Sequence, residues 1–176
     1  MKIFVYNGIS LDGFIAKKDG NIDWLVQFAN DEANQAYEEF INKIDAIAIG
    51  RGTFEKVISF PTWPYDREVF VLSSTIKQIP NINGAKVTVL SMEPRELLMH
   101  LSDKGFSNIY VDGGKVIQAF LKEDLVDELV ISTAPIIIGS GIPLFGNMDI
   151  ELQFEHVRTV VQSNGLVRSY YKRNKK

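Results

Sequence analysis

The chain has 176 residues, of which 45% are apolar, with a formal net charge of -3 and no cysteine. This length suits one buried core, so we expect residues 1–176 to form a single domain. The lack of cysteine excludes disulfides, thiolate nucleophiles and cysteine-ligated metals, and we expect no metal site. Lysine and arginine are scattered until the short tail 172–176, so we expect no nucleic-acid partner.

The N-terminal residues run directly into a strand-like segment, Ile3-Phe4-Val5-Tyr6. They lack the basic and then apolar layout of a signal peptide. No apolar run approaches the length of about 18 residues that a membrane-spanning helix needs. We therefore expect a cytoplasmic protein with no membrane association.

Strand and helix patterns alternate along most of the chain, which predicts a sheet covered by helices. Strands are expected at residues 2–8, 13–16, 45–50, 68–73, 86–91, 107–112 and 127–138. Helices are expected at about residues 31–42, 52–59, 93–103 and 114–122. The third helix has Pro94 in its first turn and Gly105 just after its end, as helix boundaries favour.

The C-terminal part reads as two further strands, 151–162 and 166–172, separated by Ser163-Asn164-Gly165. Asn-Gly between two extended runs is the strongest short-range signal for a β-hairpin. The chain is therefore expected to end in an antiparallel hairpin. Together the elements predict an α/β fold with a mixed, mostly parallel sheet. The longest irregular stretches are expected at 59–67 and 139–148.

Two glycine-rich junctions connect a predicted strand to a predicted helix. One is Asp112-Gly113-Gly114-Lys115, and the other is Gly50-Arg51-Gly52-Thr53. Glycine lets a phosphate approach the backbone amides at the positive end of the helix dipole, and arginine and threonine add a cation and a donor. Each junction taken alone also fits a plain turn, with Thr53 as a helix cap and Arg51 on the surface. Two such junctions in one chain favour a nucleotide site.

A third polar segment, Leu72-Ser73-Ser74-Thr75, follows another predicted strand. Open sheets bind their ligands at this edge, although a Ser-Ser-Thr run also suits an ordinary turn. Other nucleotide fingerprints are absent. Gly139-Ser140-Gly141 has Leu144 where a dinucleotide motif needs its third glycine, and no phosphate-loop sequence occurs.

Five motifs, taken in order, resemble the dihydrofolate reductase-like superfamily. They are Asn7 to Ala16, Gly50-Arg51-x-Thr53-Phe54-Glu55, Val71 to Ser74, Val111 to Val116 and Pro135 to Phe145. The chain is more closely similar to the reductase half of the bacterial riboflavin-biosynthesis deaminase-reductase and its stand-alone relatives. The resemblance covers nearly the whole chain and implies a three-layer fold with helices on both faces of the sheet. The deaminase half needs cysteines, so this chain is expected to reduce without deaminating.

This resemblance implies NADPH as the cofactor. Its phosphates would be held by Gly50, Arg51 and Thr53 together with Gly113, Gly114, Lys115 and Val116. Its adenosine ribose would lie between Leu72, Ser73 and Ser74. A 2′-phosphate would be recognised by Arg51, Ser74 and Lys115, which favours NADPH over NADH because a second anion needs cations and hydroxyls.

The substrate side is also placed by resemblance. Asn7, Ser10 and Asp12 would border the nicotinamide and the substrate. Asp112 stands where riboflavin-pathway reductases usually carry a glutamate near the substrate, so a shorter carboxylate is kept there. Trp63 and Tyr65 lie in a loop where they either stack on a heterocycle or pack the loop itself.

The proton donor has more than one candidate. In dihydrofolate reductase an acid near the start of the helix after the first strand assists protonation, and Asp31 and Glu32 lie in the matching region here. Asp23 is a second candidate, and Asp112 a third. Asp23 and Asp31 also fit a plain helix start, since acids favour that end for dipole reasons. We take Asp31 and Asp112 as the catalytic candidates.

The expected function is an NADPH-dependent reductase that transfers a hydride to a C=N or C=O of a small pyrimidine- or pteridine-type molecule. The most similar activity is that of 5-amino-6-(5-phosphoribosylamino)uracil reductase in riboflavin biosynthesis. The alternatives are a dihydrofolate reductase and a non-catalytic NADP(H)-binding protein. Relatives of this kind often pair, so a homodimer is expected.

Overall fold

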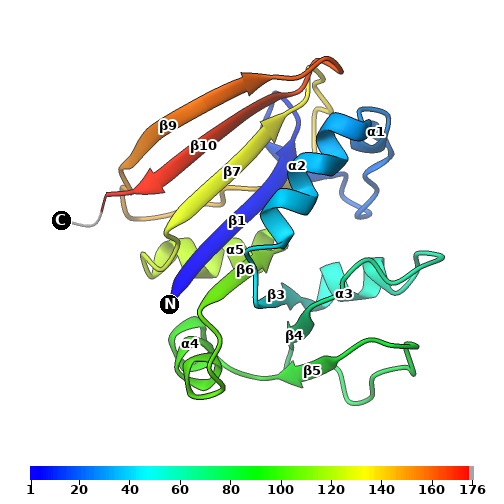
Figure 1. Ribbon diagram of the computed structural model, residues 1–176, viewed down its shortest axis with the longest axis vertical. Coiled ribbons are helices and arrows are strands. Elements are labelled where there is room, and N and C mark those ends of the chain that lie inside the picture. The colour runs from blue at the N-terminus through cyan, green and yellow to red at the C-terminus, as the bar shows by residue number, and fades with distance from the viewer. Residues whose placement is uncertain (175–176) are drawn as a thin grey trace.

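The computed structural model describes residues 1–174 and contains one eight-stranded sheet (Figure 1). The strand order is β5-β4-β3-β6-β1-β7-β10-β9. The strands are β1 Lys2–Ile9, β3 Ala46–Gly50, β4 Glu68–Leu72, β5 Val87–Leu90, β6 Asn108–Asp112, β7 Glu128–Thr133, β9 Phe154–Val161 and β10 Val167–Arg173. The strands from β5 to β7 pair in parallel, and β10 pairs antiparallel with both β7 and β9. The predicted mixed sheet with a C-terminal hairpin is thereby confirmed.

Helices cover both faces of the sheet, and Figure 1 shows α2 in front of it and α5 behind. The helices are α1 Asp23–Val26, α2 Asp31–Ile41, α3 Arg51–Val57, α4 Pro94–Asp103 and α5 Gly114–Lys122. The first core joins α2 and α3 to one face through Phe40, Ile41, Phe54 and Val57. The second joins α4 and α5 to the other face through Leu97, Leu101, Ile117 and Phe120. Each such side chain contributes about 1.5–3 kcal/mol to the stability of the fold when fully buried, so helices are held firmly against both faces of the sheet.

The structure departs from the sequence prediction in the segment after β7. The strand predicted over 127–138 ends at Thr133, because Pro135 has no N–H to continue the ladder. The apolar residues that follow, Ile136 and Ile138, pack beside Trp24 of α1. Two short elements had no periodic pattern to reveal them: the one-turn α1, and β8 (Ile142–Pro143), which pairs with β2 (Phe14–Ala16).

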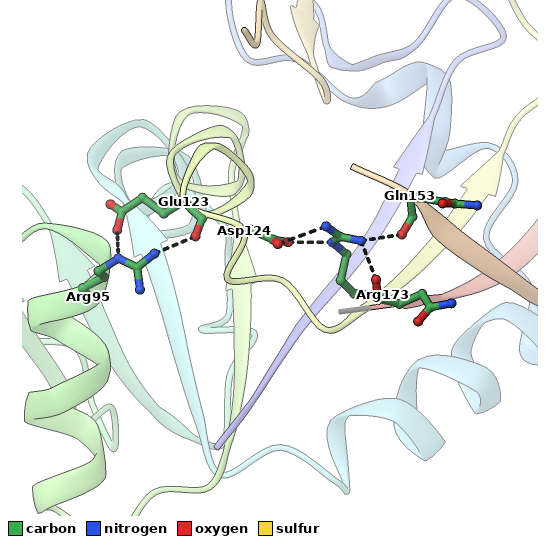
Figure 2. A network of polar contacts seen from close by, with 6 residues as sticks. Arg95, Glu123, Asp124, Gln153 and Arg173 are labelled. Carbon is green, nitrogen blue, oxygen red and sulfur yellow. Dashed lines mark hydrogen bonds and ion pairs between the residues drawn. The ribbon is translucent and has the colours of Figure 1, made fainter. Parts of the chain in front are cut away.

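Two arginines fix the C-terminal end of α5 (Figure 2). Arg173 of β10 donates through Nε and one Nη to the two carboxylate oxygens of Asp124, at 2.6 and 3.0 Å. Arg95 of α4 pairs with the Glu123 carboxylate at 2.9 Å and donates to the Glu123 carbonyl oxygen at 2.9 Å. Helix α5 is therefore tied to both α4 and the C-terminal strand, which holds its other end, with the Gly113-Gly114 turn, in a fixed place.

Candidate active site

The sheet has a switch point between its neighbouring strands β3 and β6. Helix α3 leaves β3 on one face, and α5 leaves β6 on the other. Because the strands are parallel here, their carboxyl ends lie at one edge, and diverging helices open a crevice there. This is the place where open α/β sheets bind ligands.

The two glycine-rich turns press against each other in this crevice. A Cβ added at Gly113 would lie 2.2 Å from Thr53 Oγ1, and one at Gly50 would lie 2.9 Å from Val116 Cγ2. Gly113 also has a φ of +93°, which L side chains rarely adopt. Glycine is therefore required at position 113 for two reasons, and the two predicted junctions form one structural unit.

The first turn of α5 offers unused backbone donors to this unit. The N–H groups of Gly114, Lys115 and Val116 have no intrahelical acceptor, because a helix begins with such groups. They point in the direction of the helix's positive end, which suits an anion. The turn is thus a fit for the phosphates of a dinucleotide.

One cavity of about 1000 Å³ follows the carboxyl ends of β5, β4, β3, β6 and β1 in turn. This volume is at the upper end of the range for small-molecule and cofactor sites. Every residue that the sequence assigned to the cofactor lines it, namely Gly50, Arg51, Thr53, Leu72, Ser73, Ser74, Gly113, Gly114, Lys115 and Val116. The structure therefore brings three separate motifs into one continuous space.

The part of the cavity near β4 and β5 is polar. Arg51 is exposed and lies 3.5 Å from Glu55, a surface pair weak enough to release the guanidinium. The Ser73 hydroxyl accepts the N–H groups of Thr75 and Ile76, both at 3.2 Å, which shapes the turn after β4. Ser74 beside it is exposed to the cavity.

Asp112 and Asn7 meet at the opposite end of the cavity. Asn7 Nδ2 donates to Asp112 Oδ1 at 3.0 Å, and the Gly113 N–H donates to the same oxygen at 2.7 Å. The hydroxyls of Tyr65 and Tyr110 also face this carboxyl group. Burial raises the pKa of Asp112 in spite of these donors. The acid is thereby biased toward its neutral form beside the space for a substrate.

Three tyrosines, Tyr37, Tyr65 and Tyr110, line the same end of the cavity. Burial raises the pKa of Tyr37 to about 12 and the pKa of the other two well above the usual value, so all three are neutral phenols. Tyr37 and Tyr110 were missed by sequence reasoning. Tyr110 lies two residues before Asp112 on one strand, a spacing that places both on one face. No local signal marks Tyr37, whose position depends on how α2 packs.

Three residues assigned from the sequence lie away from the cavity lining. Ser10 is buried and its hydroxyl accepts the Phe14 N–H at 3.1 Å. Asp12 accepts the N–H groups of residues 138 and 139, at 3.2 and 2.7 Å, and so ties the loop after β7 to the first turn. Asp31 is exposed at the start of α2. These contacts give Ser10 and Asp12 structural roles and make Asp31 a helix-start acid.

In the loop before β4, one aromatic side chain packs against its neighbours and another lines the cavity. Trp63 packs edge-on against Phe54 and Tyr65, with ring centroids 6.3 and 5.4 Å apart. Tyr65 lines the cavity, whereas Trp63 does not.

Asp23 is exposed and accepts from Asn21 Nδ2 at 2.6 Å. Within residues 1–174, no group of three or more His, Asp or Glu side chains is placed to hold a metal ion.

Comparison with known proteins gives the family. The family model of the RibD C-terminal domain matches residues 1–167. The chain belongs to this family. It is 36% identical over 153 residues to the Bacillus subtilis protein YwjB, covering 85% of this chain and 86% of YwjB. The predicted resemblance is confirmed, and family membership makes the chain a reductase of this type.

Solved structures agree with this assignment. A Shewanella sp. PV-4 protein named for riboflavin biosynthesis is 38% identical and superposes with a TM-score of 0.93, covering 99% of this chain and 100% of that one. Dihydrofolate reductase from Enterococcus faecalis, complexed with NADP(H), is 20% identical with a TM-score of 0.69, covering 99% and 97% of the two chains. The second likeness shows that the RibD-type domain shares the dihydrofolate reductase fold.

Proposed function

We propose that this RibD-family protein is an NADPH-dependent reductase that adds a hydride to a C=N or C=O of a small pyrimidine- or pteridine-type molecule. The activity most similar to it is that of 5-amino-6-(5-phosphoribosylamino)uracil reductase. One observation carries the proposal: a single cavity joins the interlocked turns at Gly50 and Gly113 to the Asp112–Asn7 pair. A dinucleotide laid along the sheet edge would reach from one to the other.

The residues present fit such a cofactor. The free amides at the start of α5 and the Gly50–Thr53 turn would hold its phosphates, and the Leu72–Ser74 turn would border its ribose. Arg51, Ser74 and Lys115 would bind a 2′-phosphate. When bound, the cofactor supplies the hydride. The NADP(H) found in the Enterococcus faecalis enzyme of the same fold supports this choice.

At the substrate end of the cavity, the chain itself would supply a proton and hold the donating group in a fixed orientation. Asp112 holds a proton to a higher pH than an ordinary aspartate, since burial raises its pKa. Asn7 and the Gly113 amide fix the orientation of its carboxyl group. An acid held in this way can protonate the nitrogen or oxygen that gains charge as the adjacent carbon accepts a hydride.

Calorimetric titration with NADPH and NADH tests the cofactor. NADPH is expected to bind more tightly, and Arg51→Ala should weaken NADPH about tenfold more than NADH, because a charge-assisted hydrogen bond contributes about 1.5–3 kcal/mol. Arg158→Ala is the matched control, since Arg158 is an exposed arginine of β9 that lies outside the cavity lining. An equal loss for both cofactors would contradict the 2′-phosphate assignment, and no NADPH binding by folded protein would contradict the proposal.

Turnover distinguishes this proposal from its alternatives. Oxidation of NADPH should be followed with a phosphoribosylaminopyrimidine, with dihydrofolate and with simple imines and carbonyl compounds. Activity with dihydrofolate alone would identify a dihydrofolate reductase. Tight NADPH binding with no turnover on any of these compounds would favour a non-catalytic NADP(H)-binding protein.

We further propose that the protein is a cytoplasmic homodimer. It binds a small-molecule substrate and does not bind nucleic acid or a membrane. Strand β9 forms one edge of the sheet, and its Val157 and Val161 side chains are exposed. An exposed edge of this kind can pair with a second copy. No helix among residues 1–174 is long and apolar enough to cross a membrane. Light scattering on the purified protein tests the dimer, and a monomer at micromolar concentration would contradict it.

A further inference from the structure

We propose that Gln118 of α5 is a positioning residue for the nicotinamide half of the cofactor, because its side-chain amide holds the short β2–β8 pair beside the Gly113-Gly114 turn. Gln118 itself lies outside the cavity lining. The inference rests on the proposed function, in which NADPH lies along this edge of the sheet. It adds the residue that determines how firmly one wall of the cavity is fixed.

The β2–β8 pair forms an apolar wall of the cavity. Ile15 and Ala16 of β2 and Ile142 of β8 line it. The pair lies against the first residue of α5, since a Cβ added at Gly114 would lie 3.0 Å from Ile142 Cγ2 and 3.4 Å from Ile15 Cδ1. Gly114 belongs to the turn whose free N–H groups suit phosphates. The wall is therefore next to the place proposed for the diphosphate.

This wall stands at the end of the cavity where the reaction is proposed to occur. The cavity follows the carboxyl ends of β5, β4, β3, β6 and β1 in turn, and the hydroxyls proposed to border the adenosine ribose come after β4. Strand β2 instead follows β1 through a tight turn, in which the Ser10 N–H donates to the Phe14 carbonyl oxygen at 3.0 Å. The wall thus lies on the side of β1, where Asn7 and Asp112 meet.

The β2–β8 pair has little pairing of its own. Only Phe14 with Pro143 and Ala16 with Ile142 are in register, and the register is irregular between them. Pro143 has no N–H, so it donates nothing to the ladder. Even a longer two-stranded hairpin is at best marginally stable by itself. The position of the pair therefore depends on contacts with the rest of the chain.

Gln118 supplies such a contact from the helix. Its Nε2 donates to the Pro143 carbonyl oxygen at 2.8 Å and, at 3.4 Å, to the Leu144 carbonyl oxygen. Both partners can only accept, so the amide nitrogen and not the amide oxygen must face them. The chain then passes closely over this side chain, because a Cβ added at Gly146 would lie 2.6 Å from Gln118 Oε1. The segment that follows β8 is thus held on Gln118.

Helix α5 is a firm base for this contact. Gln118 comes four residues after Gly114, so the two lie on one face of the helix. The other end of α5 is tied to α4 through Glu123 and to β10 through Asp124 (Figure 2). The Leu144 N–H donates to the Gly13 carbonyl oxygen at 3.0 Å, which joins β8 to the β1–β2 turn. Gln118 adds the link to the helix that carries the free amides, so wall and amides keep one relative position.

A wall fixed in this way favours binding by keeping water out. Apolar side chains beside the free amides of α5 lower the local dielectric and strengthen hydrogen bonds to an anion. When the wall moves away, water enters and the nicotinamide half loses its contact with Ile15 and Ile142. The adenosine half, at the far end of the cavity, keeps its contacts. Loss of Gln118 should therefore weaken the binding of one half of the cofactor only.

Amide hydrogen exchange of the protein without cofactor tests the structural step. Gln118→Met keeps an unbranched, helix-favouring side chain of similar length and removes the donor. Residues 13–16 and 141–146 should exchange about two- to tenfold faster, the loss expected for one or two hydrogen bonds, while β10 stays unchanged. Gln118→Lys can still donate and should restore most of the protection. Gln35→Met is the matched control, since Gln35 is exposed on α2 and donates only to Glu39, at 3.2 Å.

Gly146→Ala gives a second, independent perturbation. Its new Cβ would meet Gln118 Oε1, so the Gln118 side chain must move and its hydrogen bonds must lengthen. Faster exchange of residues 141–146 is expected here as well. Unchanged exchange of this segment in both Gln118→Met and Gly146→Ala would overturn the inference, because hydrogen bonds from Gln118 would then not hold the pair.

Calorimetric titration tests the positioning step with two ligands. NADPH has both halves, whereas adenosine 2′,5′-bisphosphate lacks the nicotinamide half. Gln118→Met should weaken NADPH about three- to tenfold and leave the affinity for the bisphosphate unchanged. The fluorescence of the bound reduced nicotinamide should also move toward that of free NADPH, because the ring is then more exposed to water.

The outcomes separate this inference from the proposed function. Faster exchange with an unchanged NADPH affinity would overturn the positioning role, and so would an equal loss of affinity for both ligands. If the unaltered protein binds no NADPH while the exchange differences are present, the proposed function fails and the positioning role fails with it. The exchange measurement on its own still decides whether Gln118 holds the wall.

Discussion

Replacing Gly113 with alanine tests the geometry on which the whole site depends. Two separate costs arise from the structure. A residue with a Cβ at φ +93° costs roughly 1–2 kcal/mol, and a Cβ only 2.2 Å from Thr53 Oγ1 forces a displacement that costs about 1–3 kcal/mol. Together they amount to about 2–5 kcal/mol. For a domain of this size, the melting temperature should fall by about 4–20 °C.

A double-mutant cycle separates the two costs. Thr53→Ala removes the atom that the new Cβ meets, so Gly113→Ala should cost less in that background, and only the backbone cost should remain. Gly52→Ala is the control, because a Cβ there meets nothing within 4 Å and its φ is ordinary. Alanine at this helical position should be neutral or stabilise by about 0.5–1 kcal/mol.

Urea unfolding followed by circular dichroism supplies the free energies, and NADPH titration of the folded variants supplies the functional effect. If Gly113→Ala is as stable as the unaltered protein, the turn does not have the positive φ. If Gly113→Ala costs the same whether or not Thr53→Ala is also present, the two glycine junctions do not touch, and the phosphate cradle is built differently.

Three further changes test other parts of the structure. Asp112→Asn should stabilise the protein at neutral pH and lose this advantage below about pH 4. Folding raises the pKa of Asp112, so its contribution to stability is complete below the pKa of the unfolded chain and is lost as pH rises through the pKa of the folded protein. Urea unfolding at a series of pH values measures this difference. Gln162→Leu should cost about 1.5–3 kcal/mol, because the buried Arg168 guanidinium donates to Gln162 at 3.2 Å and would lose this partner. Adding Arg168→Met should restore most of that stability, and no recovery would contradict this reasoning. Arg173→Lys should cost about 1 kcal/mol in thermal unfolding, since lysine cannot make both bonds to Asp124, whose 40% side-chain exposure weakens the pair; an unchanged melting temperature would show that the pair contributes nothing.

The sequence predicts the fold, and the gathering of the glycine turns and hydroxyls at one edge of the sheet, because both rest on local signals. Glycine at 50 and 113 marks a backbone that must turn sharply, and the hydroxyls after β4 follow a strand end. Parallel pairing then brings these ends together without further information. Resemblance to a family supplied Asn7 and Asp112, which local chemistry alone would have left as strand-end residues.

The substrate side is less predictable because its contacts depend on register and packing. Ser10 and Asp12 belong to a motif whose polar groups turn out to satisfy the backbone of nearby loops. Asp31 has the composition of a proton donor but the position of a helix start. Tyr37 reaches the cavity only through the packing of α2 on the sheet. Which polar side chain faces a ligand, and which serves the chain itself, is decided by tertiary contacts.

The end of the β1–β6 ladder connects the fold to the chemistry. Beyond Phe4 and Tyr110 the two strands no longer exchange backbone hydrogen bonds, which leaves room for the Asp112 carboxyl group between their ends and leaves the Tyr6 carbonyl without a backbone donor. The Tyr110 hydroxyl donates to the Tyr6 carbonyl at 3.0 Å and so supplies the missing donor. Continued pairing by one more residue would remove both features, so the early end of this ladder is itself part of the proposed proton-donating site.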